Sequence, residues 1–394
     1  MNMPFHVIIV GASLAGCHLA KCLAQQGYLV ALVERRADPD AYKVMCSHLL
    51  HPNVVHTLQD YHLYDSLVEQ GGQATYLDIQ VRGRHLFYPF NRQARMANIE
   101  RRLLDPAVRH KAIEQPGVSF FPGAKVQELV YDAHQRVTGV EIQTQNAQTL
   151  TLHAPLTVGA DGKGSAVAAL AHLKMRTLEN GRAAYFAYYE ASQTATASQI
   201  WVIDKGRSYV GVFPNGPKVL VSCYLPKAHP AAAKGADIER HFDQMMATTL
   251  REQALGPRIG NVIAARQTSS QYRPKHRPGL TLVGDAYLSA DPLTGVGCSW
   301  ALRSAELLAT SLGNINPGTQ PSHLSTQQID CALQQYRSRH AMHLWAPAYA
   351  LAFVSTHGRL LTHPLLVKPA SWLASKVAHR PLAAWVPAYL PHDT

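Results

Sequence analysis

The first 34 residues carry the pattern that most narrows the choice of fold. The β-branched run Val7–Val10 is typical of a strand buried on both faces, and apolar residues recur at helical spacing from Leu14 onward. Gly11 lets the backbone leave the strand sharply, and Gly16 lets the helix approach the sheet closely. A second apolar run ends at Glu34. We therefore expect a strand, a tight turn, a helix and a second strand that closes with a carboxylate.

This order of elements suits the binding of a dinucleotide. A helix that begins after a glycine turn directs unpaired N–H groups at a pyrophosphate. Glu34 lies at about the separation expected of an acid that accepts hydrogen bonds from an adenosine ribose, and it would repel a 2′-phosphate. Ser13 stands where the G-x-G-x-x-G pattern has its second glycine, although its hydroxyl could still donate to phosphate. An ordinary strand-turn-helix of an α/β domain is the alternative interpretation.

Two later stretches repeat the step from a strand into glycines. Residues 156–165, LTVGADGKGS, read as a buried strand that enters a glycine-rich turn with one carboxylate, Asp161. Residues 278–297 read as a strand that ends in Gly-Asp, followed by an Asp-Pro turn and a Gly-x-Gly helix start. Such a helix start would form another anion-binding N-terminus.

Composition narrows the class of protein. With 394 residues the chain is long enough for a large core and two structural modules. Its net charge of +11 comes from scattered Lys and Arg without a dense basic run, so we interpret it as attraction for an anionic cofactor or co-substrate rather than nucleic acid. Six cysteines without a C-x-x-C pair are typical of reduced, cytoplasmic proteins. The histidines match no metal-ligand spacing, so no metal site is predicted.

No targeting or membrane-spanning segment is evident in the sequence. The apolar run near the N-terminus is too short for a signal peptide, and no stretch of about 18 apolar residues occurs. From Gln327 onward the chain reads as helical with many prolines and tryptophans, which suits either an amphipathic cover or a membrane-surface element. We expect a cytoplasmic protein, and a peripheral membrane contact through this segment stays open.

Outside the three motifs, helical and strand periodicities divide the chain. The expected helices lie at residues 52–68, 101–115, 236–255 and from 327 onward. The expected strands are a hairpin at 74–90 that turns at Gly83, a meander at 118–121, 125–131, 137–144 and 149–153, and an antiparallel sheet at 184–191, 199–203, 208–213 and 219–225. The expected domains are a discontinuous first domain (1–72, 98–180 and 276–330), a second domain (73–97 and 181–275) and a C-terminal helical segment (331–394).

Taken together and in this order, the three motifs resemble the FAD-dependent aromatic hydroxylases. These are single-component flavoprotein monooxygenases of the para-hydroxybenzoate hydroxylase type, related to the geranylgeranyl reductases and flavin halogenases. The resemblance covers about residues 5–312 and includes Arg101-x-x-Leu104-Asp105 and the strand around Gly123–Val126. It implies an α/β fold in which a Rossmann-like FAD-binding domain of the glutathione-reductase type carries an inserted antiparallel β-sheet substrate domain and C-terminal helices.

The resemblance also implies which residues hold FAD. The ADP half would be held by Gly11, Ser13, Leu14, Ala15, Gly16, Glu34, Arg35, Arg101 and Val126. The flavin half would be held by Lys43, Asp161, Gly284, Asp285, Pro292, Gly295, Val296 and Gly297. Backbone N–H groups after Pro292 would stabilise negative charge on the reduced ring. For Asp161, a turn aspartate that caps a helix is the alternative. The catalytic candidates are His48, Tyr189 and Pro292.

The implied function is an FAD-dependent monooxygenase that uses NADPH or NADH and O2, forms a flavin C4a-hydroperoxide, and hydroxylates or epoxidises a small aromatic or lipophilic substrate. The sequence has no second glycine-rich dinucleotide fold, so NAD(P)H would bind transiently or an external flavin reductase would supply electrons. The substrate pocket is expected between the flavin and the second sheet. Residues that could line it, or equally belong to the core, are Tyr76, Phe87, Tyr189, Trp201 and Phe213.

Three other functions remain as alternatives. A geranylgeranyl reductase-like enzyme that saturates isoprenoid double bonds is favoured by the apolar C-terminal segment. Lys43 and Cys46 fall close to the Lys-x-Cys-Gly pattern of those reductases and of the halogenases, but with one extra residue between them. A halogenase is disfavoured because the Trp-x-Trp-x-Ile-Pro signature is absent and Trp201-Val-Ile stands alone. The third alternative is a non-enzymatic flavin-binding module.

Overall fold

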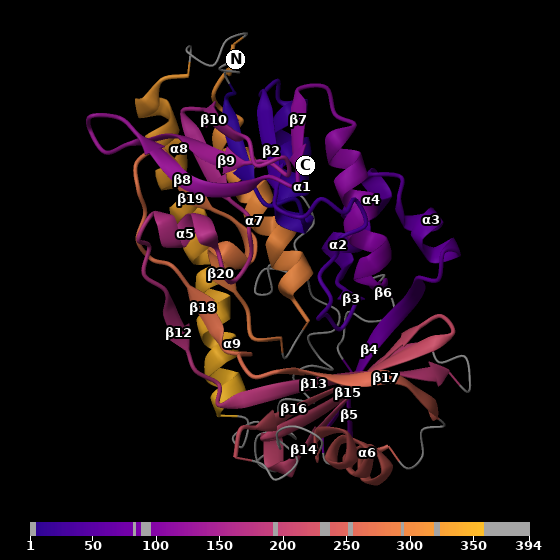
Figure 1. Ribbon diagram of the computed structural model, residues 1–394. Helices are drawn as coiled ribbons and strands as arrows, with labels where there is room; N and C mark the ends of the chain where they lie inside the picture. The colour runs from indigo at the N-terminus through magenta and orange to yellow at the C-terminus, as the bar shows by residue number, and fades with distance from the viewer. Residues whose placement is uncertain are drawn as a thin grey trace.

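The computed structural model describes residues 5–81, 84–87, 96–191, 196–228, 237–250, 255–292, 295–318 and 324–357. The expected hairpin turn at Gly83, the side chain of Phe87 and the part of the C-terminal segment beyond residue 357 lie outside the described structure. The described chain forms two lobes, with a parallel sheet and its helices in one and a large mixed sheet in the other (Figure 1).

The first predicted motif forms the centre of a five-stranded parallel sheet. Its order is β19-β11-β1-β2-β7, with β1 (Val7–Val10), β2 (Val30–Glu34), β7 (Val118–Pro122), β11 (Leu156–Gly159) and β19 (Leu280–Leu282). Every residue of β1, β2, β11 and β19 is buried, as their near-continuous apolar character requires in a sheet covered on both faces. Val10 is level with Val33 on one side and Gly159 on the other. The three glycine motifs therefore leave the sheet at the same edge.

Helices pack on one face of this sheet. Helix α1 (Leu14–Gln25) contacts both α4 (Arg101–Ile113) and α7 (Gly297–Leu312). An antiparallel meander of β8 (Lys125–Tyr131), β9 (Val137–Gln143) and β10 (Thr149–His153) contacts strands β2 and β11 of the parallel sheet.

The meander has three strands instead of the four that we expected. Strand β7 leaves it and pairs in parallel with β2, with Val118 level with Val30. Strands β2 and β7 are therefore a parallel pair whose long connection ends in α4. The strand periodicity of residues 118–122 alone cannot distinguish such a strand from a meander strand.

The second lobe is a nine-stranded sheet of order β17-β13-β16-β15-β14-β4-β6-β3, with β5 paired to β4. Its strands are β3 (Leu49–Leu50), β4 (Gln73–Val81), β5 (Arg84–Phe87), β6 (Met96–Asn98), β13 (Arg182–Ala191), β14 (Ala197–Ile203), β15 (Ser208–Asn215), β16 (Lys218–Pro226) and β17 (Leu255–Ala265). The antiparallel sheet and the hairpin of β4 and β5 are confirmed, although β4 and β14 pair in parallel. Strands β3 and β6 connect this sheet to segments of the first lobe. The expected domain boundaries therefore stay a prediction.

The two faces of the large sheet differ. One face packs on α6 (Asp237–Thr249), which is shorter than expected because β17 begins at Leu255. The other face turns toward the parallel-sheet lobe and carries a separate apolar cluster. A small sheet of β12 (Arg176–Leu178), β18 (Ser270–Tyr272) and β20 (Leu288–Ser289) lies between the lobes.

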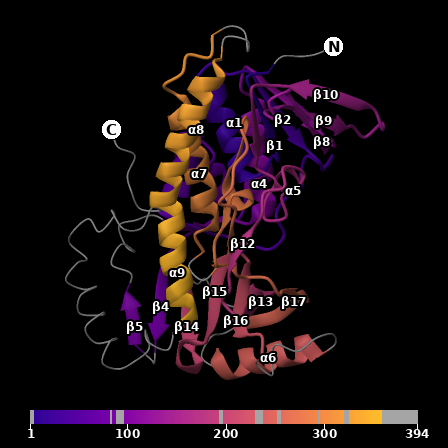
Figure 2. The ribbon, with the colours of Figure 1, turned by 90° about the vertical axis from the view of Figure 1, so that its left-hand side faces the viewer.

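The remaining helices flank these layers. The helix expected at residues 52–68 is two helices, α2 (Pro52–Asp60) and α3 (Tyr64–Glu69), because His62 adopts a left-handed φ of 55° between them. Helix α5 (Ala166–Leu170) follows the second glycine motif. Helix α8 (Thr326–His340), a π-helical turn (Ala341–Trp345) and α9 (Ala346–Thr356) form one rod along both lobes (Figure 2). Among the described helices, none is long and apolar enough to cross a bilayer.

Candidate active site

A cleft of about 690 Å³ runs along the carboxyl edge of the parallel sheet. Its wall includes the turns that follow β1, β2, β11 and β19, and it reaches β13 and β16 of the second sheet. In open α/β sheets, ligands bind in the crevice outside the carboxyl ends of the strands. The three predicted motifs thus meet in one cavity.

The turn after β1 is packed too closely for side chains at its two glycines. Gly11 has φ +110°, and a Cβ there would lie 2.5 Å from the Ala160 carbonyl oxygen. A Cβ on Gly16 would lie 1.9 Å from the Gly11 carbonyl oxygen. The N-terminus of α1 therefore reaches the cleft as bare backbone, and the Ser13 side chain does not cap it. These are the features of an anion-binding turn.

Glu34 lies at the end of β2, lines the cleft and is 5% exposed. Its Oε2 accepts a hydrogen bond from the Ala12 N–H at 2.8 Å, and its Oε1 accepts one from the Arg36 N–H at 3.0 Å. The carboxylate therefore ties the second strand to the glycine turn while it faces the cavity. Arg35 and Val126 line the same end of the cleft.

Arg101 begins α4 and is buried against Asp105. Its Nε donates to Asp105 Oδ1 at 2.6 Å, and one terminal nitrogen donates to the Ser13 hydroxyl at 3.1 Å. Burial disfavours the charged guanidinium, but the Asp105 carboxylate outweighs it and raises the pKa of Arg101. The guanidinium is thus held, charged, at the cleft wall beside the helix α1 N-terminus.

The sequence analysis missed Arg109, which lies two turns further along α4. Its guanidinium is buried and donates to the carbonyl oxygens of Ala12, Pro39 and Ala41. It therefore fixes both the glycine turn and the loop after β2. The Arg-x-x-Leu-Asp motif ends at Asp105, so only the helical spacing of basic residues on α4 could have indicated it.

Asp161 follows β11 and has one satisfied and one unsatisfied oxygen. Its Oδ2 accepts from the Val167 N–H of α5 at 3.1 Å, whereas the buried Oδ1 has no hydrogen-bond partner. Burial raises the pKa of the carboxyl. Asp161 therefore caps helix α5 in part, as the alternative interpretation expected. The N-cap residue itself is Ser165, however, and Asp161 also lines the cleft. Its free oxygen is available to a ligand.

Asp285 follows β19 and forms an ion pair with Lys43 across the cleft wall. Lys43 Nζ donates to Asp285 Oδ2 at 2.9 Å, which raises the pKa of Lys43. The Lys43 backbone N–H also donates to Asp105 at 2.9 Å. The three predicted segments around residues 43, 101 and 285 are therefore linked by hydrogen bonds, although they lie far apart in sequence.

The turn from Pro292 to Gly297 leads into α7 at the far end of the cleft. Gly295 has φ +68° and donates its N–H to the Pro292 carbonyl oxygen at 3.1 Å. Pro292, Gly295 and Gly297 line the cleft, whereas Val296 is buried and does not. No side chain caps α7, so the first N–H groups of this helix are open to a ligand. Gly284 and Gly16 lie behind the cleft wall and do not line the cleft.

Two cysteines meet beside this turn. Cys46 and Cys298 both line the cleft, and the His48 N–H donates to Cys46 Sγ at 3.3 Å. A hydrogen bond from the Cys298 thiol lowers the pKa of Cys46, although burial opposes the thiolate. Cys46, the cysteine of the imperfect Lys-x-Cys-Gly match, therefore lies in the cavity.

His48 is buried beneath the cleft and does not line it. Its Nε2 is hydrogen-bonded to the Tyr188 hydroxyl and its Nδ1 accepts the Arg101 N–H at 3.2 Å. Because Nδ1 accepts, the neutral ring carries its proton on Nε2. His48 has a left-handed φ of 64°, which a non-glycine residue adopts only when its surroundings hold it there.

Tyr189 is not brought to the cleft, and its neighbour Tyr188 takes the inward position. Side chains alternate along β13, so Phe186 and Tyr188 face the first lobe whereas Tyr189 faces α6 and hydrogen-bonds Asp243 at 3.4 Å. We therefore withdraw Tyr189 as a catalytic candidate. Trp201 packs on the same outer cluster, and Tyr76 lines neither cavity.

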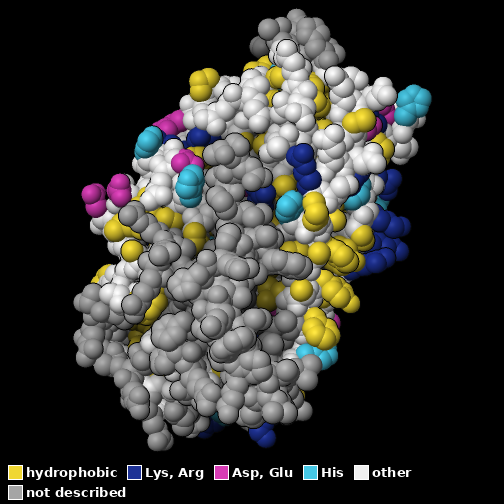
Figure 3. Space-filling view, turned by 180° about the vertical axis from the view of Figure 1, so that it is seen from behind, with side chains coloured by type: hydrophobic (Ala, Val, Ile, Leu, Met, Phe, Trp, Pro, Cys, Tyr) yellow, Lys and Arg dark blue, Asp and Glu magenta, His cyan; other side chains and the backbone are white. Residues whose placement is uncertain are grey.

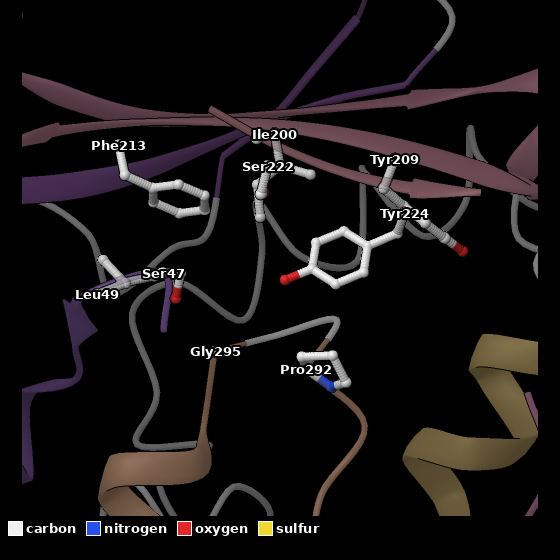
Figure 4. Close-up of a pocket in the computed structure, with 10 residues that line it drawn as sticks. Ser47, Leu49, Ile200, Tyr209, Phe213, Ser222, Tyr224, Pro292 and Gly295 are labelled. Carbon is white, nitrogen blue, oxygen red and sulfur yellow. The ribbon is translucent and has the colours of Figure 1, made fainter. Parts of the chain in front are cut away.

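A small pocket lies between the large sheet and the Pro292–Gly295 turn (Figure 4). Its lining combines apolar and hydroxyl side chains with two glycines: Ser47, Leu49, Ile200, Tyr209, Gly211, Phe213, Ser222, Tyr224, Pro292 and Gly295. Four of these residues also line the large cleft: Ser47, Tyr224, Pro292 and Gly295. The pocket is thus continuous with the cleft and lies where the substrate site was expected, with Phe213 as the expected lining residue that it contains.

The residues of the cleft fit FAD. Of the proposed cofactor-binding residues, the cleft lining includes Gly11, Ser13, Leu14, Ala15, Glu34, Arg35, Lys43, Arg101, Val126, Asp161, Asp285, Pro292, Gly295 and Gly297. Two uncapped helix N-termini and the free Asp161 oxygen offer donors and an acceptor to such a ligand. Among the described residues no cluster of potential metal ligands occurs.

Comparison with protein families agrees with this fit. The FAD binding domain family model matches residues 5–334. The chain is 30% identical over 325 residues to ubiquinone hydroxylase UbiL of Rhodospirillum rubrum, covering 78% of this chain and 72% of the relative. It is 26% identical to squalene epoxidase 3 of Arabidopsis thaliana over 81% of this chain and 62% of that enzyme. It is also 25% identical to a digeranylgeranylglycerophospholipid reductase of Methanocella arvoryzae, over 80% of this chain and 79% of the relative.

Solved structures share the fold. The myxobacterial chondrochloren halogenase CndH has a TM-score of 0.74 at 17% identity, over 99% of this chain and 94% of that one. PqsL of Pseudomonas aeruginosa in complex with 2-aminobenzoylacetate has a TM-score of 0.71 at 17% identity, over 95% of this chain and the whole of the other. At these identities the likeness establishes the architecture alone. With the matched family model and the relatives above, the chain belongs to the FAD binding domain family of flavin-dependent monooxygenases and is an FAD-dependent oxidoreductase.

Proposed function

We propose that the protein uses NAD(P)H and O2 to hydroxylate or epoxidise a small aromatic or lipophilic substrate. The continuity of the two cavities carries this proposal, because Pro292 and Gly295 line both the FAD-sized cleft and the pocket under the second sheet. A substrate in the pocket would therefore lie against the part of the cofactor that the turn from Pro292 to Gly295 holds. The relatives named as a ubiquinone hydroxylase and a squalene epoxidase support an apolar substrate.

Bound FAD would supply the activation of O2, and the protein would supply binding, orientation and electrostatic stabilisation. Glu34 would accept hydrogen bonds from the adenosine ribose, and Arg101 would neutralise pyrophosphate charge. The N–H groups at the start of α7 would face developing negative charge in a site shielded from water. Pro292 would hold this turn in shape by its fixed φ.

His48 would act as a positioning residue rather than as a proton donor to substrate. It joins Tyr188 of the second sheet to the first turn of α4 through one hydrogen bond on each ring nitrogen. This bridge spans the two lobes that form the pocket, and its loss should alter their spacing.

The described residues form one dinucleotide cradle, which leaves two arrangements for the supply of electrons. NAD(P)H would bind transiently along the cleft, whose lining includes the basic side chains of Arg35 and Lys163. Alternatively, an external flavin reductase would reduce the bound cofactor. Rapid reduction of the purified holoenzyme by NADPH or NADH alone would support the first arrangement.

Oxygen transfer is tested with the purified yellow protein, NADPH, ¹⁸O2 and two probe substrates, 4-propylphenol and squalene. We expect one ¹⁸O atom in the product of at least one probe, detected by mass spectrometry. Products without ¹⁸O, in the presence of a flavin that NADPH reduces, would contradict the monooxygenase.

Reduction of isoprenoid double bonds is the second candidate. It is favoured by the similarity to the archaeal digeranylgeranylglycerophospholipid reductase and by Cys46 in the cleft lining. An anaerobic incubation with NADPH and geranylgeraniol separates the two activities. Saturated product without oxygen would favour the reductase.

We also propose a contact with a membrane surface through the C-terminal part of a cytoplasmic protein. Hydrophobic side chains gather where α9 runs along the flank (Figure 3), and Met342, Tyr349 and Phe353 are 65%, 54% and 54% exposed. Helix α9 is apolar around most of its circumference rather than divided into an apolar and a charged face, and its exposed apolar side chains could still bind a bilayer surface without crossing it. Sedimentation with phosphatidylglycerol vesicles tests this contact, and a protein that stays in the supernatant at low salt would contradict it.

A further inference from the structure

The small pocket under the second sheet has a polar end that none of the motifs indicated. Ser222 and Tyr224 lie two residues apart on β16, so their side chains share the face that looks toward the first lobe. Figure 4 shows the Tyr224 hydroxyl directed toward the middle of the pocket, with Ser222 above it and Gly295 on the opposite wall.

Ser222 is fully buried, and its hydroxyl has no hydrogen-bond partner. A buried hydroxyl without a partner is unfavourable to the fold, so its presence in a pocket points to a ligand group that satisfies it. Gly211 lies opposite Ser222 on the neighbouring strand. A Cβ at Gly211 would lie 2.8 Å from Ser222 Oγ and 2.6 Å from the Phe213 ring, so the glycine keeps a side chain away from this hydroxyl and gives the space to the Phe213 ring, which is another wall of the pocket.

Tyr224 is 7% exposed and lines both cavities. Burial raises its pKa, so the phenol stays protonated and can donate a hydrogen bond at any ordinary pH. Tyr209, by contrast, already donates its hydroxyl hydrogen to the Gly206 carbonyl oxygen at 3.0 Å. Among the pocket residues on β15 and β16, the hydroxyls left for a ligand are therefore those of Ser222 and Tyr224, which lie close enough to influence each other.

The pocket lining contains no Lys, Arg, His, Asp or Glu among the described residues. A carboxylate placed there would lose its hydration without gaining a cation, whereas a neutral oxygen needs only hydrogen bonds. The other lining side chains are mostly apolar, including Leu49, Ile200 and Phe213. The pocket itself has a volume of about 10 Å³, which is room for one water-sized group. It therefore suits a single uncharged oxygen whose apolar ring or chain lies in the adjoining cleft, which Tyr224 also lines.

We propose that Ser222 and Tyr224 bind a single neutral hydroxyl or carbonyl oxygen of an otherwise apolar substrate and reject substrates with a carboxylate in that position. This inference rests on the proposed function, because it names the substrate class of the same site. It adds two residues that determine specificity.

The test is a titration of the holoenzyme with 4-propylphenol, propylbenzene and 4-propylbenzoate, followed by the change in flavin absorbance. The native protein should bind 4-propylphenol about tenfold more tightly than either other compound, as two net hydrogen bonds allow. In Ser222→Ala and Tyr224→Phe, the preference for 4-propylphenol over propylbenzene should fall severalfold, while the affinity for propylbenzene stays the same.

A matched control is Thr157→Val, which removes another buried hydroxyl without a partner, on β11 outside the pocket. It should keep the native preference. Ser222→Ala should unfold at the same or a higher temperature, since its hydroxyl has no partner in the free protein. A marked loss of thermal stability would instead indicate a structural role and overturn the proposal.

Equal binding of the phenol and propylbenzene, no measurable binding of the phenol, or preferred binding of 4-propylbenzoate would also overturn the proposed polar end. These results are independent of the ¹⁸O experiment. Transfer of ¹⁸O with no preference for the phenol would leave the monooxygenase standing, whereas the binding preference without ¹⁸O transfer would contradict only the proposed reaction.

Discussion

The two ends of the active-site cleft are built in opposite ways. The dinucleotide end consists of backbone N–H groups and close contacts within residues 11–34, and its two glycines leave no room for a Cβ. The substrate end consists of side chains from strands that meet only after the whole sheet has formed. Substitutions should therefore act on cofactor binding and folding at the first end, and on ligand choice at the second.

The largest effect is expected where a charge is buried at the dinucleotide end. Arg101→Gln leaves the Asp105 carboxylate, which is 1% exposed, without its charged partner. Removal of one member of a buried pair costs about 3–5 kcal/mol. Urea unfolding should show this loss together with loss of bound FAD. The double substitution Arg101→Leu with Asp105→Leu should recover much of the lost stability but not the bound FAD. If the double variant retains as much FAD as the native protein, Arg101 does not lie at the pyrophosphate.

The next effect concerns the ion pair that holds α1 against α7 behind the cleft. His18 Nε2 lies 3.4 Å from Glu306 Oε1, and both residues are nearly buried. Burial opposes the charged forms, but Cys22 and Glu306 raise the pKa of His18 to about 10, and His18 lowers the pKa of Glu306 to about 2.

The raised pKa of His18 contributes stability below its ordinary value of 6.5, and this contribution is lost as the pH rises from 6.5 toward 10. The lowered pKa of Glu306 contributes stability above its ordinary value of 4.5, and this is lost as the pH falls toward 2. The free energy of unfolding should therefore fall between pH 7 and pH 9.5. Glu306→Gln should flatten this slope, and an unchanged slope would assign it to other groups.

A smaller effect should separate hydrogen-bond acceptance from charge at Glu34. Glu34→Ala removes the acceptor of the Ala12 N–H and of the proposed ribose hydroxyl, so FAD affinity should fall at least about tenfold, as loss of charged hydrogen bonds implies. Glu34→Gln keeps one acceptor oxygen and should bind FAD more tightly than the alanine variant. Equilibrium dialysis measures both. Equal losses would show that charge is what matters at this position.

At the junction of the two ends, Gly295→Val should affect reduction more than cofactor retention. Gly295 has φ +68°, which a valine adopts only with strain, so the turn must shift even though a Cβ there would make an ordinary contact with Leu49 at 3.4 Å. The cradle around Gly11 should still hold FAD. We expect a yellow protein that NADPH reduces about tenfold more slowly because the N–H donors at the start of α7 are displaced with the turn. A native reduction rate with full FAD would place this turn away from the reacting ring.

The smallest effect should distinguish the two faces of β13. Tyr188→Phe removes the hydrogen bond to His48 and should weaken ligand binding in the pocket by a few-fold, about 0.5–1.5 kcal/mol for one net hydrogen bond. Tyr189→Phe removes a hydrogen bond to Asp243 on the outer face and is the matched control. It should bind 4-propylphenol as the native protein does. The reverse order would restore Tyr189 as the active-site tyrosine.

The sequence by itself determined the dinucleotide end. A strand, a turn that excludes side chains, a helix and a terminal acid are consecutive, so Gly11, Gly16 and Glu34 could be identified before any tertiary contact was known. The later turns around Asp161 and Asp285 could be identified from local sequence in the same way. Each follows a buried strand, and parallel strands bring such turns to one edge.

Only the tertiary structure decided the substrate end. Whether Tyr188 or Tyr189 faces the first lobe depends on a register of one residue, because neighbouring side chains of a strand point to opposite faces. The openness of Ser222 depends on Gly211 across the sheet, and the placement of Arg109 depends on carbonyl groups of two distant loops. A local pattern can specify a turn, but pairing between distant strands determines which side chains share a cavity.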